Sequence, residues 1–429
     1  MKSNTSKSHF TFLWSGQAIA NYADVMIIMT LIFTIYDQTG SAALSGLVPL
    51  IRTLVVILSG LLAPLLLDRF PLTRLLSVSQ LLQLLGYVVL SFYLIHLPQH
   101  ENYFLLFLSY ACICFLDGWT SPAKQALVPR LVPRTSLVKA NSVVSVSDQI
   151  AQLAAWALGG ILIVLIPISL LLTIMVSLYT ISFILILFIK EPTNVEKLEG
   201  TENVDNDEAK RKSLPSIQSI LEGWKAIFQH ALLRKLMVMD MIEGIVGGVW
   251  IGALTLIYVQ EQLGKAEVWW GFINTAYFVG AIVGGVFVGY IMKKLRLNLW
   301  SSMVVGAALF SGLVWVYAFS TQAWLAVFVT LFMGPAFQLR DISQTTLYQQ
   351  SVNQQLYPKV ISAKDTINTA LMAISIALMT VIADLFGIQL VYMITAICSG
   401  ISAIVGILSY QTFKPYLSPA THDVMQKQV

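Results

Sequence analysis

The chain has 429 residues, of which 57% are hydrophobic and only 11% are charged, and its formal net charge is +4 at pH 7. Soluble domains carry about 25% charged residues, because a folded surface needs charge to stay in solution. This composition argues against an ordinary soluble protein and indicates an integral membrane protein. Three cysteines, Cys112, Cys114 and Cys398, lie in apolar runs, as is typical of small buried residues and not of a disulfide framework or a metal site.

Long apolar runs follow one another along the whole chain. A helix needs about 20 apolar residues to cross the hydrocarbon core of a bilayer. The first run is too long for the apolar region of a signal peptide and no cleavage site follows it, so we expect it to remain as an anchor. The sequence predicts twelve spans, at 10–36, 42–67, 75–96, 103–120, 142–165, 168–189, 236–259, 268–292, 299–319, 322–339, 366–385 and 388–410.

The positive charges predict the orientation of these spans. With a cytoplasmic N-terminus, nearly all of the 26 Lys and Arg fall in links on the inner side. Lys265 is then the basic residue of an outer link, and Arg52 lies inside a span. Because inner loops carry an excess of Lys and Arg, we expect both termini to be cytoplasmic.

A polar segment divides the chain into two halves. Residues 190–213 are rich in both charge signs, which predicts a disordered linker. In 214–235, apolar residues recur at helical spacing, which predicts either a helix along the inner membrane surface or an extension of the seventh span. The expected organisation is a six-helix bundle at 1–189, a cytoplasmic linker with an amphipathic helix at 190–235, a second six-helix bundle at 236–410 and a cytoplasmic tail at 411–429.

The two halves repeat one another at an offset of 220 residues. The segment 125–142 aligns with 345–362, and both follow the fourth helix of their half. Six helices plus six, with a central linker, is the layout of parallel repeats in secondary transporters. The matched residues are Leu127, Val132, Lys139 and Ser142 with Leu347, Val352, Lys359 and Ser362.

Five segments carry a family resemblance: FLWSGQAIANYAD, TGSAALSGLVPLIR, LLLDRFPLTRLL, SPAKQALVPRLVPRTSLVKANS and ADLFG. With these segments the chain resembles the major facilitator superfamily, and more narrowly its drug/proton antiporters of the macrolide-efflux and enterobactin-exporter type. The resemblance implies an all-α membrane protein with twelve transmembrane helices in two six-helix halves. It also implies a monomer in the bacterial cell membrane that transports by alternating access.

The loop after the second span matches the family pattern in part. Asp68, Arg69 and Arg74 match, whereas Pro64 and Pro71 stand where the family has glycine or a polar residue. The resemblance implies a gating contact between helices that holds one conformation closed. Without that resemblance, these charged residues indicate only the orientation of the spans in the membrane. In the fifth span, Ala155-Trp156 replaces the Gly-Pro pair of many antiporters, which weakens the case for antiport from this motif.

Asp24 is the one charged residue between Phe10 and Tyr36. It lies about 20 Å along the first helix, at a depth similar to that of Arg52 in the second. Arginine cannot lose its proton, so Arg52 needs a counter-charge or water, and Asp24 is the nearest candidate in the sequence. The pair is then either a fixed buried ion pair or a switchable one. In the second case, separation from Arg52 makes Asp24 take up a proton.

Asp240 and Glu243 lie three residues apart on one face of the seventh span. No basic residue lies deeper in that helix, so we expect a water-filled cavity with a second proton or cation site. The alternative places both acids at the inner interface beside Arg234 and Lys235. Polar residues in other spans are candidates for orienting a substrate among aromatic side chains, although packing or anchoring also explains them. They are Gln17, Asn21, Tyr22, Asn274, Tyr277 and Gln338.

The sequence has no catalytic constellation, no metal-ligand spacing and no ATP-binding loop, so we expect no enzyme, cofactor or nucleic-acid partner. The favoured function is proton-driven export of a neutral or cationic amphipathic molecule such as a drug or macrolide. An alternative cargo is a siderophore or a lipid-like metabolite. An anionic cargo would favour a cavity with basic residues, yet Arg52 is the one basic residue expected within the spans, so the charge balance favours a neutral or cationic cargo. A non-transporting receptor or scaffold is a third possibility, but it needs no carboxylate in mid-membrane.

Overall fold

The computed structural model describes residues 2–96, 103–191, 217–250, 253–266, 268–295 and 298–414, and all regular structure in these ranges is helical. The disordered linker expected at 190–213 lies almost entirely outside them. The elements of the first half are α1 (Lys2–Thr39), α2 (Ala42–Leu67), α3 (Leu72–His96), α4 (Tyr103–Leu131), η1 (Arg134–Ser136), α5 (Leu137–Leu165) and α6 (Ile168–Leu187).

The second half begins after the linker. Its elements are α8 (Ile217–Gln229), α9 (Ala231–Gly247), η2 (Gly248–Trp250), α10 (Ala253–Ile257), the π-helix η3 (Tyr258–Gln262), α11 (Val268–Leu295), α12 (Leu299–Ala318), α13 (Ala323–Ser351), α14 (Tyr357–Phe386), α15 (Ile388–Leu408) and α16 (Tyr410–Phe413).

Ten described helices are long and apolar enough to cross a membrane, and the bent pair 231–250 and 254–262 adds an eleventh. This confirms the predicted all-α membrane fold. α5 is long enough but is not among the ten, and its first half carries Asn141, Ser145 and Asp148. Before the break between the two members of the bent pair, α9 passes into η2 at Gly248, whose N–H donates to Ser375 Oγ at 3.0 Å. A Cβ at Gly248 would lie 2.7 Å from the backbone N of Ile376, so this position needs glycine.

Three predicted boundaries are wrong. α4 continues to Leu131 and α13 to Ser351, far beyond the predicted ends at 120 and 339, and α14 begins at Tyr357 and not at 366. The extra turns carry charges such as Arg340 and Lys359, and both residues are buried. The prediction stopped at charged residues because lipid excludes them, whereas here the protein itself covers them.

The repeat reappears in the helix boundaries. α4 and α13 end at Leu131 and Ser351, and α5 and α14 begin at Leu137 and Tyr357. Both pairs keep the offset of 220 residues that the sequence alignment gives. The chain forms two compact units that exchange segments between the halves. Unit 1 is Met1–Arg134, Ala151–Lys225 and Gln354–Thr366, and unit 2 is Thr135–Ile150, Ala226–Asn353 and Ile367–Val429.

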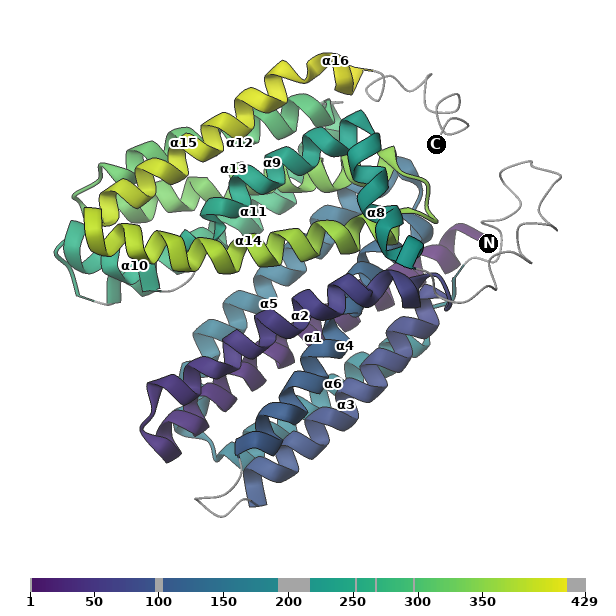
Figure 1. Ribbon diagram of the computed structural model, residues 1–429, viewed down its shortest axis with the longest axis vertical. Coiled ribbons are helices and arrows are strands. Elements are labelled where there is room, and N and C mark those ends of the chain that lie inside the picture. The colour runs from purple at the N-terminus through teal and green to yellow at the C-terminus, as the bar shows by residue number, and fades with distance from the viewer. Residues whose placement is uncertain are drawn as a thin grey trace. The chain divides into compact units, whose positions relative to one another are not determined.

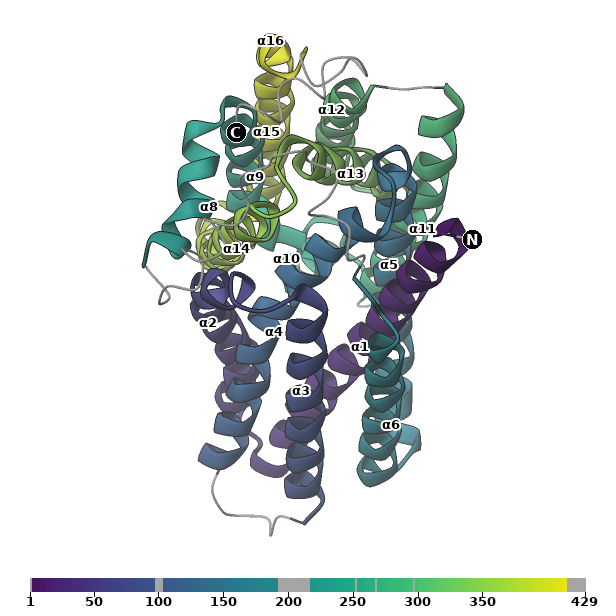
Figure 2. The ribbon, with the colours of Figure 1, turned by 90° about the vertical axis from the view of Figure 1, so that its right-hand side faces the viewer.

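In unit 1, α4 packs against α2 and α3, while α6 packs against α1 and α3 (Figure 1). In unit 2, α13 packs against α11 and α12, and α15 packs against α12 and α9 (Figure 2). Close backbone approach between α11 and α13 depends on glycine, because a Cβ at Gly280 would lie 2.0 Å from Leu331 O. These packed helices fix the positions of the polar side chains described below.

Within the segment 214–235, the described residues form α8 (Ile217–Gln229) as a separate helix that ends before α9 begins at Ala231. His230 breaks the helix, and Arg234 donates to the carbonyl of Phe228 across the break at 2.8 Å. Gly223 and Ile227 are buried, whereas Leu221 and Phe228, two of the apolar residues that recur at helical spacing in this segment, keep 54% and 62% of their surface exposed. The protein therefore leaves much of that apolar face uncovered.

Candidate functional site

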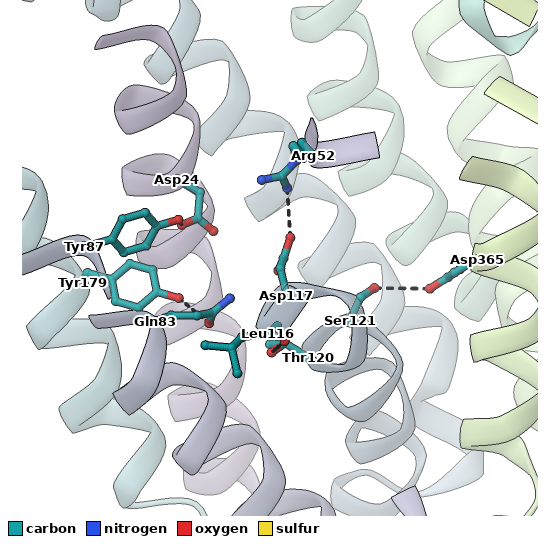
Figure 3. Close-up of polar contacts among 10 residues, drawn as sticks. All are labelled: Asp24, Arg52, Gln83, Tyr87, Leu116, Asp117, Thr120, Ser121, Tyr179 and Asp365. Carbon is teal, nitrogen blue, oxygen red and sulfur yellow. Dashed lines mark hydrogen bonds and ion pairs between the residues drawn. The ribbon is translucent and has the colours of Figure 1, made fainter. Parts of the chain in front are cut away.

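Asp24 is held by a tyrosine and not by an arginine. The hydroxyl of Tyr87 on α3 donates to Asp24 Oδ1 at 2.6 Å (Figure 3). The Tyr87 ring packs edge-on against Tyr179 of α6, with ring centres 5.0 Å apart. Tyr179 in turn donates to Gln83 Oε1 at 2.7 Å. Asp24 thus adjoins a group of neutral side chains on α3 and α6, which are joined by two hydrogen bonds and one ring contact.

The expected pair between Asp24 and Arg52 is absent. Arg52 Nη2 instead lies 3.0 Å from Oδ2 of Asp117 on α4, and Figure 3 shows the guanidinium directed at that carboxylate. The two side chains expose 36% and 27% of their surface, so they are not sealed in a tightly packed core. With Arg52 engaged by Asp117, an ionised Asp24 keeps only a neutral direct partner.

Sequence reasoning missed Asp117 although it lies within a predicted span. Arg52 required an acid, and depth along antiparallel helices made Asp24 the nearest candidate. Depth does not give the rotation of a helix about its axis, and α2 packs against α4 more extensively than against α1. An inventory of all acids within the spans would have found Asp117 as an alternative partner.

In unit 2, the two acids of α9 share an arginine from α13. Arg340 Nη1 pairs with Glu243 Oε2, and Arg340 Nη2 lies 3.7 Å from Asp240 Oδ1. Asp240 also accepts hydrogen bonds from Gln344 Nε2 and the Tyr348 hydroxyl, both at 2.9 Å. The expectation of two acids without a basic partner is therefore wrong.

The α13 residues of this cluster were recognisable by spacing. Arg340, Gln344 and Tyr348 recur every four residues, so they share one helix face. The prediction assigned Arg340 to a link because it ended the tenth span at 339. Arg340 exposes only 8% of its side chain. A buried arginine needs its acids, and Arg340 is a second arginine within the spans beside Arg52.

The residues expected to form a gate have different surroundings. Asp68 caps the C-terminus of α2, and its Oδ1 lies 2.7 Å from Lys359 Nζ at the start of α14. Lys359 also pairs with Glu222 of α8. Arg69 and Arg74 are exposed and make no ion pair with other residues in the described ranges. Of the three, only Asp68 joins two helices.

The six candidate substrate residues divide between the units, three in each. Gln17 is buried with an unpartnered Nε2, while Asn21 and Tyr22 are half-buried. Asn274 donates to Trp270 O of its own helix at 2.8 Å, and Tyr277 packs beside Phe337. Gln338 is fully buried and accepts from Ser145 at 2.7 Å.

Helices that pack into two units and carry charges in their interior define a membrane transporter more readily than an enzyme. The family model of the Major Facilitator Superfamily matches residues 13–374, so the chain belongs to this superfamily of membrane transporters.

The chain is 31% identical over 406 residues to an MFS-type transporter, YfmI of Bacillus subtilis (strain 168), which is named as uncharacterized, covering 95% of this chain and 97% of that one. It is also 22% identical over 397 residues to Macrolide efflux protein A of Streptococcus pyogenes, covering 90% and 92% of the two chains.

Solved structures share the fold at low sequence identity. A bacterial homologue of the iron transporter ferroportin in an outward-facing state aligns with a TM-score of 0.75 and 15% identity, covering 94% of this chain and 99% of that one. The transporter FucP in its outward conformation gives a TM-score of 0.74 and 14% identity over the same shares. At such identity the likeness supports the fold alone.

Proposed function

We propose that this protein is a proton-coupled exporter of a neutral or cationic amphipathic molecule, with Asp24 as the group that gains and loses the proton. The observation that carries the proposal is the pairing in unit 1. Arg52 is neutralised by Asp117, so Asp24 can change its charge without breaking an ion pair. Acidic groups within membrane helices mark proton or ion paths by default.

The hydrogen bond from Tyr87 supports both charge states of Asp24. The ionised carboxylate accepts from the hydroxyl at 2.6 Å, and the protonated carboxyl needs only a neutral partner. Burial favours the protonated state, and the hydrogen bond favours the ionised state. A step that changes water access at Asp24 then changes its proton occupancy, which links proton movement to alternating access.

Proton entry supplies enough energy for export. A membrane potential of 100 mV provides about 2.3 kcal/mol per charge, and one pH unit adds about 1.4 kcal/mol. At tenfold per 1.4 kcal/mol, one proton sustains roughly a 500-fold gradient of a neutral substrate. Coupling to ATP is not needed for this gradient.

The buried charges favour a neutral or cationic cargo. The two ion-pair clusters and Asp24 together contain more carboxylates than guanidinium groups. An anionic siderophore would require the opposite balance. The similarity to Macrolide efflux protein A supports an amphipathic drug such as a macrolide as the cargo.

The proposed orientation has both termini and α8 on the cytoplasmic side of a bacterial cell membrane. There, the exposed Leu221 and Phe228 of α8 face the lipid surface, and Lys359 links Asp68 to Glu222 as a gate. The protein acts as a monomer.

The test uses everted membrane vesicles with an imposed pH gradient and radiolabelled erythromycin as the probe. Wild-type protein should accumulate the probe when the interior is acidic. Asp24→Asn should abolish this accumulation and retain exchange of labelled for unlabelled probe. Undiminished accumulation by the variant would remove Asp24 from the mechanism, and the absence of any transport by the wild type would favour a receptor or scaffold.

A further inference from the structure

The interior of unit 1 differs on the two sides of Asp24. On the side that we propose to face outward, α1, α3, α4 and α6 bury a continuous apolar cluster. One leucine from each helix belongs to it: Leu31 of α1, Leu90 of α3, Leu106 of α4 and Leu171 of α6. Each leucine lies nearer the outward end of its helix than the polar residue of the same helix, which is Asp24, Tyr87, Asp117 or Tyr179, respectively. Among the described residues, the buried polar groups on that side are hydroxyls, such as those of Thr34 and Tyr110, and the cluster holds no amide side chain.

On the cytoplasmic side of Asp24, buried amides and hydroxyls point into the same unit. Gln80 and Gln83 precede Tyr87 on α3, seven and four residues away, and each exposes 1% of its surface. Gln17 precedes Asp24 by seven residues on α1, which places it about 10 Å nearer the cytoplasmic end. Ser182 donates to Gly16 O at 2.7 Å and lies about 8 Å from the end of α6. We call Gln17, Gln80, Gln83 and Ser182 the polar column.

Two atoms of the polar column lack a partner among the described residues. They are the donor Gln17 Nε2 and the acceptor Gln80 Oε1, and both are fully enclosed. An unsatisfied buried polar group costs about 1–3 kcal/mol, so side chains that only join helices should not leave such atoms open. Buried water satisfies groups of this kind when two to four polar partners surround it.

The second unit does not repeat this arrangement. α12 takes the place of α3 in the chain order of its half, and its buried polar residues are Ser302, Ser311 and Tyr317. It buries no glutamine or asparagine. Unit 2 buries its amides on other helices, with Asn141 on α5 and Gln338, Gln344 and Gln349 on α13. What is particular to unit 1 is the position of the amides along α3.

We propose that the polar column is the path by which Asp24 exchanges protons with the cytoplasm, separate from the opening used by the substrate. This inference deepens the proposed function and rests on Asp24 as the coupling group. In release, the Asp24 carboxyl gives its proton to the Tyr87 oxygen while the Tyr87 hydroxyl proton passes to a water molecule. The glutamines hold this water and the next one, and the excess proton leaves as hydronium in the cytoplasm. The glutamines are positioning residues.

Other groups around Asp24 do not open this path. Tyr179 faces it from α6 through Tyr87, Arg52 lies on α2, and Asp117 and Lys124 lie on α4. Arg52 stays charged and bound to Asp117, so neither provides a mobile proton. Tyr179 donates to Gln83 Oε1 and so fixes the orientation of the Gln83 amide.

The test measures how fast Asp24 responds to a pH step on the cytoplasmic face of oriented proteoliposomes. Infrared spectroscopy follows the carbonyl stretch of the protonated carboxyl, identified as the band that Asp24→Asn removes. Gln80→Leu and Gln83→Leu should slow the response about 100-fold, the scale of a positioned proton transfer, with the midpoint of the titration unchanged. Gln83→Glu should restore the rate, because its carboxyl holds water and relays protons.

The matched control is Gln149→Leu on α5, outside the polar column. It removes a half-buried amide whose enclosed Oε1 has no partner among the described residues, and it should leave the rate unchanged. Wild-type rates in Gln80→Leu and Gln83→Leu would overturn the path, and so would a shifted midpoint at unchanged rate. Neither result contradicts the proposed function. That proposal is contradicted by a different result, namely that Asp24→Asn still accumulates erythromycin.

Discussion

At the scale of single residues, the charges within the helices are of two kinds. Arg52 and Arg340 each have carboxylate partners, whereas Asp24 has a tyrosine hydroxyl. The sequence located Asp24, Arg52, Asp240 and Glu243 because a charged residue in an apolar run is conspicuous. It did not reveal the pairings, because those depend on helix rotation and on helix ends that hydropathy places too early.

Arg340 provides a prediction about stability. Arg340→Met leaves Glu243 and Asp240 without their buried cation, and breaking a buried ion pair costs about 3–5 kcal/mol. We expect a marked fall in the thermal unfolding temperature of the purified protein in detergent. The double variant Arg340→Met/Glu243→Gln removes one of the stranded charges and should recover part of the loss. If Arg340→Met unfolds at the wild-type temperature, the cluster does not hold α9 to α13.

At the scale of helices, the ends were harder to predict than the spans. The bounds of α2 agree with the predicted 42–67, because its apolar run is broken by polar residues on both sides. The predicted tenth span ends at 339 because Arg340 and Asp341 follow. The predicted eleventh span begins only at 366 because the charged residues Lys359, Lys364 and Asp365 precede it. Asp365 is not placed in lipid, since it accepts hydrogen bonds from Gln125 and Ser121 of α4 at 2.9 and 3.2 Å.

The contact of α8 with the start of α14 provides a prediction with a matched control. A Cβ at Gly223 would lie 2.4 Å from Lys359 O, whereas a Cβ at Gly312 of α12 would have no neighbour within 4 Å. Gly223→Ala should destabilise the protein, because overpacking costs about 1–3 kcal/mol. Gly312→Ala should stabilise it by up to about 1 kcal/mol through helix propensity. Thermal unfolding of both variants measures the difference, and equal shifts of the same sign would mean that α8 is not docked.

At the scale of the whole molecule, the repeat is kept in the helix boundaries but not in the charges. Lys359 is buried between Asp68 and Glu222, whereas its repeat partner Lys139 is exposed. At the offset of 220 residues, the counterpart of Asp68 is Val288, and the following residues 289–297 include basic residues and no acid. The alignment of 125–142 with 345–362 predicted the symmetry of the backbone, but equal residues at equivalent places have different surroundings.

This asymmetry predicts that the two lysines differ in function. Lys359→Met leaves Asp68 and Glu222 facing each other without a cation, so the start of α14 should separate from α2. A cysteine at Ser362, whose hydroxyl now donates to Gly60 O at 2.6 Å, should then react faster with a water-soluble maleimide in a background free of native cysteines. Lys139→Met should leave the labelling rate unchanged. Equal labelling in both variants would show that Lys359 does not act as a gate.

The central claim of the proposed function is that protons move through Asp24 in the direction opposite to the substrate. The most direct measurement records proton flux, with a pH-sensitive dye, and labelled erythromycin flux in the same proteoliposomes. Wild-type protein should move protons and erythromycin in opposite directions, and Asp24→Asn should exchange erythromycin without proton movement. Proton movement that remains coupled to erythromycin in Asp24→Asn would contradict the account.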